Sequence, residues 1–127
     1  MSLPARPINY SVEEYLEMEA KSDVRHEYIA GQIFAMAGSS EAHNVIAGNI
    51  FARLRASLRG SGCRAFIFDM KAHVERDDAF YYPDVMATCE AFDAGSLFKS
   101  RPFLIVEVLS RSTATIDRRE KLAAYRR

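Results

Sequence analysis

The chain has 127 residues, which allows one domain with a substantial core but not two. Apolar residues make up 49% and charged residues 27%, as in a globular chain, which excludes fibrous and low-complexity classes. The 17 basic residues balance the 17 acidic ones, so any polyanion site must come from a local patch. Residues 1–10 lack the apolar stretch of a signal peptide and no run is long enough to span a membrane. We therefore expect a cytoplasmic protein with no membrane partner.

Residues 1–38 predict a short helix followed by a β-hairpin. Ser11 to Glu14 has the form of a capping box, and we expect the helix to end by Lys21 or Ser22. Two strand-like runs, 24–29 and 32–37, flank Ala30-Gly31, which is the arrangement of a hairpin.

A second helix is predicted from about residue 41 to 58, with glycines ending it. The side chains that recur at helical spacing mark its expected buried face: Val45, Ile46, Asn49, Ile50, Leu54 and Leu58. Three arginines fall largely elsewhere: Arg53, Arg55 and Arg59. We interpret them as a solvated helix surface, with phosphate contact as the alternative.

Three strands and a helix are predicted next. Residues 63–75 alternate as one long strand, with Asp69, Lys71 and His73 on a face that ordinary surface pairing can satisfy. Residues 80–87 and 102–109 form the other two strands, joined by a loop at 90–101 without recognisable chemistry, and a helix follows from about residue 114.

The element order predicts the α/β (α+β) class, with a mixed central sheet flanked by helices and preceded by the short helix and hairpin. We expect a single domain over residues 1–127, with 1–38 as its N-terminal part and 39–127 as an αβββα core. The chain stops in an unfinished helix, so we expect it to be C-terminally truncated and to lack its last strand. A homodimer would be one way to cover the apolar edge that this leaves.

Two carboxylates interrupt otherwise apolar strands. Asp84 follows Pro83, and Glu107 lies within 104–109, a run that is apolar on both faces, as in a covered central strand. A buried carboxylate is costly unless it is paired or holds a metal. Two of them on neighbouring strands offer the oxygen ligands that Mg²⁺ or Mn²⁺ requires. The alternatives are a turn-capping role for Asp84 and an ion pair with an arginine for Glu107.

Phosphodiester hydrolysis also needs a cation that orients the attacking water. Lys121 lies on the last predicted helix, on one face with Asp117 and Tyr125, and an intrahelical pair with Asp117 is its alternative role. Lys71, on the strand before Asp84, is the other candidate for this cation.

These residues resemble a known superfamily. Pro83-Asp84 followed by Glu107 resembles the PD-(D/E)xK signature of restriction-endonuclease-like nucleases, and the element order resembles their core. Four segments are together similar to a bacterial group of restriction-endonuclease-like proteins: 27–31, 82–85, 105–110 and 117–125. The signature places a lysine where this chain has Leu109, and the resemblance implies that the lysine has moved to Lys121.

The resemblance implies a Mg²⁺-dependent (or Mn²⁺-dependent) endonuclease acting on DNA, with Asp84, Glu107 and Lys121 as catalytic residues. It also implies Glu27 as a metal ligand beside Asp84 and Glu107. His43 lies in another recurring segment, and we interpret it as a helix-start histidine satisfied by local backbone. Two other functions stay open: a catalytically inactive nucleic-acid-binding or assembly module of the same fold, and a metal hydrolase of another phosphoester.

The two cysteines, Cys63 and Cys89, lie in separate segments without metal-ligand spacing. We interpret them as reduced thiols of a cytosolic protein, with a disulfide as the alternative.

Overall fold

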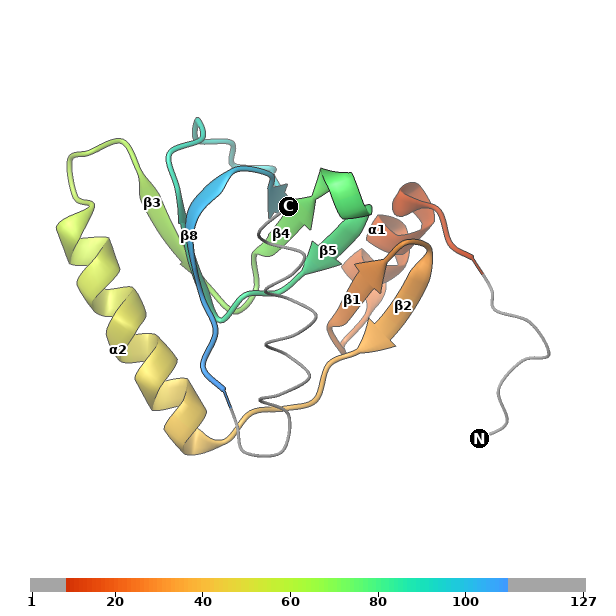
Figure 1. Cartoon of the computed structure of the whole chain (residues 1–127), viewed down its shortest axis with the longest axis horizontal. Coiled ribbons are helices and arrows are strands. Elements are labelled where there is room, and N and C mark those ends of the chain that lie inside the picture. The colour runs from red at the N-terminus through yellow and green to blue at the C-terminus, as the bar shows by residue number, and fades with distance from the viewer. Residues whose placement is uncertain (1–8, 110–127) are drawn as a thin grey trace.

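The computed structural model describes residues 9–109, which form two helices and two β-sheets (Figure 1). The elements are α1 (Val12–Lys21), β1 (His26–Ile29), β2 (Gln32–Ala35), α2 (Glu41–Ser57), β3 (Arg64–Ile67), β4 (Lys71–Val74), the 3₁₀ turn η1 (Glu75–Asp77), β5 (Ala79–Tyr81), β6 (Val85–Thr88), β7 (Phe98–Lys99) and β8 (Pro102–Val106). The larger sheet has the order β2-β1-β5-β4-β7 and the smaller one β3-β6-β8. Because β4 and β7 pair in parallel while the other neighbours are antiparallel, the predicted mixed α+β class is confirmed.

The predicted N-terminal helix and hairpin are confirmed. The Ser11 hydroxyl accepts a hydrogen bond from Glu14 N at 3.1 Å, and the Glu14 carboxylate accepts one from Ser11 N at 2.9 Å, which completes the capping box. Ala30 and Gly31 have φ angles of 48° and 90°, as a two-residue type I′ turn requires.

An aromatic cluster attaches α1 to the larger sheet. The ring of Tyr15 lies 5.0 Å from that of Tyr28 and 5.4 Å from that of Phe80, and all three side chains are buried. The two phenols remain hydrogen-bonded, since Tyr28 donates to the carbonyl of Tyr10 and Tyr15 to that of His26. Burial of these rings therefore leaves neither hydroxyl unsatisfied.

Helix α2 packs against β3 and β6 of the smaller sheet. Its buried face is centred on Ala47, with Ile50, Leu54 and Leu58 half-buried as predicted. Val45, Ile46 and Asn49, predicted to be buried, are exposed instead. The face of α2 that carries Ala47 is therefore the one turned toward the sheet.

The predicted strand 63–75 is wrong, because the chain turns within it and passes from one sheet to the other. Phe68 has a φ of 57°, in the left-handed region that side chains other than glycine rarely adopt, and it separates β3 from β4. The predicted strand 80–87 also divides, with Pro83 between β5 and β6. Phe68 N donates a hydrogen bond to the carbonyl of Asp84 at 3.1 Å, so the two crossings lie side by side.

Three further differences concern the last described segments. Residues 98–99, predicted to be loop, form β7. Strand β8 ends at Val106, so Glu107 lies just beyond it, and within the described residues β6 rather than β8 lies between two strands. The predicted final helix, with Lys121, and the missing last strand lie outside the described residues. Between residues 9 and 109, neither helix has the length and apolar character needed to cross a bilayer.

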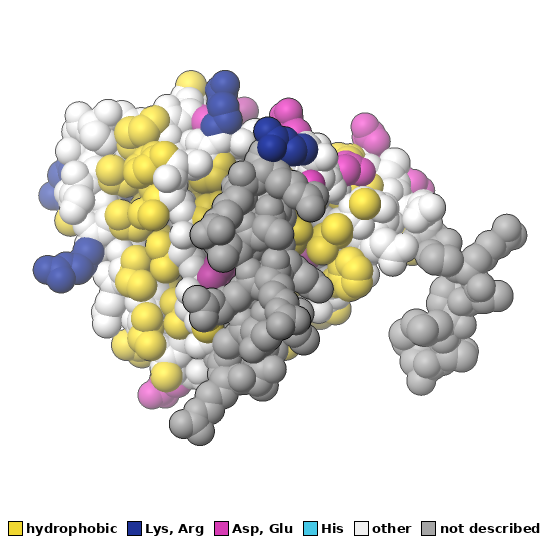
Figure 2. Space-filling model, in the orientation of Figure 1, with side chains coloured by type: hydrophobic (Ala, Val, Ile, Leu, Met, Phe, Trp, Pro, Cys, Tyr) yellow, Lys and Arg dark blue, Asp and Glu magenta, His cyan; other side chains and the backbone are white. Residues whose placement is uncertain are grey.

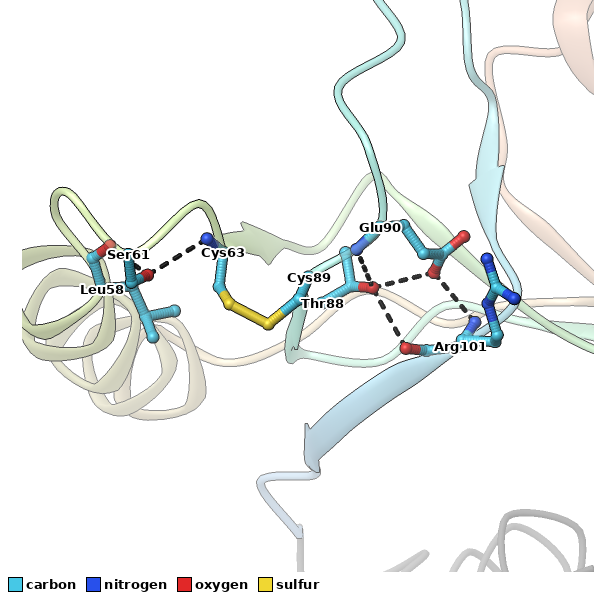
Figure 3. The surroundings of a disulfide bond; sticks show 7 residues. All are labelled: Leu58, Ser61, Cys63, Thr88, Cys89, Glu90 and Arg101. Atoms are coloured by element: carbon cyan, nitrogen blue, oxygen red, sulfur yellow. Dashed lines mark hydrogen bonds between the residues drawn. A yellow bond between two sulfur atoms is a disulfide. The ribbon is translucent and has the colours of Figure 1, made fainter.

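The prediction of two reduced thiols is also wrong: Cys63 and Cys89 form a disulfide (Figure 3). Arg64 pairs with Thr88 at the end of the β3-β6 ladder, so the two cysteines face each other one position farther along, with 4.0 Å between their Cα atoms. Sequence spacing does not reveal this proximity, because strand pairing creates it.

Candidate active site

The carboxylate of Asp84 lies at the junction of the two sheets, directly after the buried Pro83. Its Oδ2 atom accepts one hydrogen bond from Val108 N at 2.7 Å and another from His43 Nε2 at 3.0 Å. The side chain is only 14% exposed. Two N–H donors on one oxygen therefore hold the carboxylate in a fixed orientation.

His43 reaches Asp84 from the first turn of α2. The hydroxyl of Ser40 accepts a hydrogen bond from the backbone N of His43, so local capping satisfies only the main chain. The imidazole lies over the ring of Phe68, and its Nδ1 is buried without a hydrogen-bond partner among the described residues. Our interpretation of His43 as a locally satisfied histidine is therefore wrong. A signal was present, since His43 stands four residues before Ala47 and so shares its buried face.

The strand register brings Glu107 to the same place. Val85 of β6 pairs with Val106 of β8. Because the two strands are antiparallel, extending this register by one position sets Asp84, which precedes Val85, opposite Glu107, which follows Val106. The hydrogen bond from Val108 N to Asp84 continues this contact beyond the ladder. Opposed residues of an antiparallel pair have Cβ atoms about 4.5–5.5 Å apart on one face. The predicted proximity of the two acids therefore has a basis in the strand pairing, and their sharing of a metal ion stays a prediction.

Glu27 on β1 binds the backbone close to Asp84. Its Oε2 atom accepts a hydrogen bond from Tyr82 N at 3.0 Å, two residues before the site carboxylate. Within residues 9–109, no group of three or more His, Cys, Asp or Glu side chains converges as a metal cluster. The structure thus shows Glu27 supporting the segment that carries Asp84, and its role as a metal ligand stays a prediction.

A second set of buried polar side chains surrounds Tyr82. The Glu19 carboxylate, 5% exposed, accepts hydrogen bonds from the Tyr82 hydroxyl at 2.6 Å and from His26 N at 2.7 Å. Burial raises the pKa of Tyr82, and its hydrogen bond to Glu19 adds to the effect. Glu19 was not among the predicted site residues, although its position four residues after Tyr15 places it on the buried side of α1.

Lys71 lies in this interior set and not on the surface. Its Nζ atom is 3.4 Å from the carbonyl oxygen of Leu97 and 5.4 Å from the centre of the Tyr82 ring. Burial lowers the pKa of Lys71, and the charge of Glu19 opposes that shift. The predicted surface trio is wrong, because Asp69 lies in the turn, exposed and 3.8 Å from Arg25, while the His73 ring stacks on Phe80.

Comparison with known proteins identifies similar chains. Residues 12–127 match the Uma2 family model, described as "Putative restriction endonuclease". An uncharacterized protein of Synechocystis, slr1290, is 38% identical over 124 residues, covering 96% of this chain and 65% of that protein. A second uncharacterized protein of Synechocystis, sll1609, is 33% identical over 116 residues, covering 89% of this chain and 66% of that protein. This chain thus spans just under two thirds of the length of both relatives.

The fold is similar to that of a solved structure. A crystal structure of "a putative nuclease belonging to DUF820" from Anabaena variabilis superposes with a TM-score of 0.72. The match covers 94% of this chain and 69% of the other, at 19% sequence identity, and therefore shows a shared fold.

Proposed function

Since this chain belongs to the Uma2 family and has a restriction-endonuclease-like fold, we propose that it is a Mg²⁺-dependent endonuclease that cleaves DNA at the junction of its two sheets. The observation that supports this most directly is the environment of Asp84. Two N–H donors orient its carboxylate, and the strand register sets Glu107 opposite it.

The donor atoms at this junction suit a hard divalent cation. Asp84 and Glu107 would hold the ion with their carboxylates, while the two hydrogen bonds on Oδ2 orient Asp84. Oxygen ligands of this kind fit Mg²⁺ and Mn²⁺. When bound, such an ion would supply charge stabilisation to the phosphate and acidify a water molecule. The family resemblance adds Glu27 as a further ligand.

The other residues of the chain orient these groups. His43 donates a hydrogen bond to Asp84 and so keeps the carboxylate turned toward the junction. Glu27 holds Tyr82 N and thereby the segment that leads into Asp84. Lys121, outside the described residues, would position the attacking water, as the family resemblance implies.

Asp84→Asn tests the proposal. The amide keeps the size of the side chain and an oxygen that can accept the hydrogen bond of Val108 N, so the fold should persist. We expect cleavage of a DNA duplex with Mg²⁺ or Mn²⁺ to fall by a factor on the order of 10²–10³, and calorimetry to show lost Mn²⁺ binding. Asp69→Asn is the matched control, because that carboxylate is 90% exposed and should be dispensable. Equal cleavage by wild type and Asp84→Asn would refute the site.

The same assay separates the other functions. DNA binding by the wild type without cleavage under either metal would assign an inactive binding module. Hydrolysis of a small phosphodiester such as bis(p-nitrophenyl) phosphate, without DNA cleavage, would assign a hydrolase of another phosphoester and refute DNA as the substrate.

A further inference from the structure

A groove lies at the C-terminal end of α2, at the other end of this helix from His43. Its volume is about 590 Å³, and it extends from the last turns of α2 to the start of β3. Its lining includes Arg55, Arg59, Arg64, Phe51 and Leu58. We call this site the arginine groove.

The arginine groove is basic and carries no acidic lining residue among those described. Within residues 9–109, no ion pair joins Arg55, Arg59 or Arg64 to a carboxylate. Arg55, in the last turn of α2, and Arg59, just after the helix ends at Ser57, are both exposed. Figure 2 shows basic side chains projecting from the edge of the molecule along which α2 runs.

Arg64, the third arginine, distinguishes the arginine groove from an ordinary helix C-terminus. The dipole of α2 favours a cation in its last turn, which accounts for Arg55. It does not account for Arg64, which comes from β3 and lines the same groove. The Arg64 guanidinium lies over the ring of Phe92 at 4.8 Å, and such stacking leaves the in-plane N–H groups available. Guanidinium groups of this kind suit phosphate oxygens.

The length of α2 sets the distance between His43 and the arginine groove. Helical rise of 1.5 Å per residue places Arg55 about 18 Å from His43 along the helix axis. Duplex DNA advances about 3.4 Å per base pair, so this distance corresponds to roughly five base pairs. A duplex held at Asp84 and lying along α2 would therefore bring its backbone to the arginine groove.

We propose that the arginine groove binds the phosphate backbone of duplex DNA about half a helical turn from the cleavage site. Its placement relative to the cut rests on the proposed nuclease function. Binding itself does not depend on cleavage, so the two can be tested separately. Each arginine that contacts a phosphate should contribute about 0.9 to the slope of log affinity against log salt concentration.

The test uses the full chain and a duplex of about 20 base pairs, long enough to span both sites. Binding is measured by fluorescence anisotropy without divalent metal, over a series of salt concentrations. We expect Arg55→Gln to lower the slope by about 0.9 and Arg55→Gln/Arg59→Gln by about 1.8. Arg53→Gln removes the same charge from an exposed position of the same helix outside the groove, and should leave the slope unchanged. Circular dichroism checks that each variant is folded.

Equal slopes for Arg53→Gln and Arg55→Gln would overturn the inference, because the effect would then be one of net charge alone. Wild-type slopes in the double variant would also overturn it. If the wild type cleaves DNA but Arg55→Gln and Arg55→Gln/Arg59→Gln keep the wild-type slope, the nuclease proposal stands and phosphate binding in the arginine groove is refuted. A lowered slope in a protein that cleaves no DNA would leave the groove standing and refute the nuclease proposal.

Discussion

His43 Nε2 donates a hydrogen bond to Asp84 Oδ2 at 3.0 Å, with both side chains largely buried at 16% and 14% exposure. Val108 N donates to the same oxygen. One carboxylate thus connects the start of α2, the start of β6 and the segment after β8. The orientation of this carboxylate depends on all three elements, so a change in any of them should reach the site.

The first prediction concerns His43. Replacing it by leucine removes the N–H that orients Asp84 while keeping an apolar side chain over Phe68. We expect Mn²⁺ affinity, measured by calorimetry, to fall about 10–100-fold, as for other groups that orient a metal ligand. His43→Gln, whose amide can still donate, should retain most of the affinity. Wild-type affinity in His43→Leu would contradict the positioning role.

The second prediction separates the two lysines. Lys121→Ala should reduce metal-dependent DNA cleavage by a factor on the order of 10²–10³, because it removes the cation that we assign to the attacking water. Lys71→Ala should reduce cleavage less, since the Lys71 amine lies against Leu97 and Tyr82. Cleavage rates normalised to the folded fraction provide the measurement. A larger loss in Lys71→Ala would refute the assignment of Lys121.

The third prediction concerns pH and stability. Burial lowers the pKa of Lys71 below its ordinary value of 10.5, so between these two pKa values the unfolded chain binds more protons than the folded one. The Lys71 contribution to the free energy of unfolding should therefore rise with pH up to about 10.5. Lys71→Met should abolish this rise and be more stable than wild type at neutral pH.

Urea unfolding over this pH range provides the test. Lys21→Met is the control, because Lys21 is 77% exposed and should show no such difference from wild type. At each pH, the free energy of unfolding of the variant is subtracted from that of wild type. This subtraction removes the contribution of the tyrosines, which titrate in both proteins. Parallel curves for wild type and Lys71→Met would contradict the prediction.

The fourth prediction concerns the disulfide. Cys63 and Cys89 close a loop with a sequence separation of 26, for which chain entropy gives a stabilisation of about 3.5 kcal/mol. Reductant should lower the unfolding midpoint of wild type, since Cys89 is exposed to it. The variant Cys63→Ala/Cys89→Ala should be less stable than oxidised wild type and insensitive to reductant. Equal midpoints with and without reductant in wild type would refute a stabilising bond.

Local interactions made the N-terminal part and the acidic residues predictable. The Ser11 capping box and the Ala30-Gly31 turn depend on residues a few positions apart, so the sequence contains all the partners. Asp84 and Glu107 also stood out, because a carboxylate contrasts with an apolar strand whatever the strand pairs with. The type and order of most elements, and two candidate site residues, follow from the sequence by itself.

The tertiary structure alone decided how these elements combine. The turn at Phe68 and the break at Pro83 redirect two predicted strands between sheets, and the alternating pattern of side chains does not encode that change of partner. The contact of His43 with Asp84 and the bond between Cys63 and Cys89 join residues far apart in sequence. Such contacts depend on which strand pairs with which and on which helix face meets the sheet. Both are determined by packing of the whole domain and not by any local stretch of the chain.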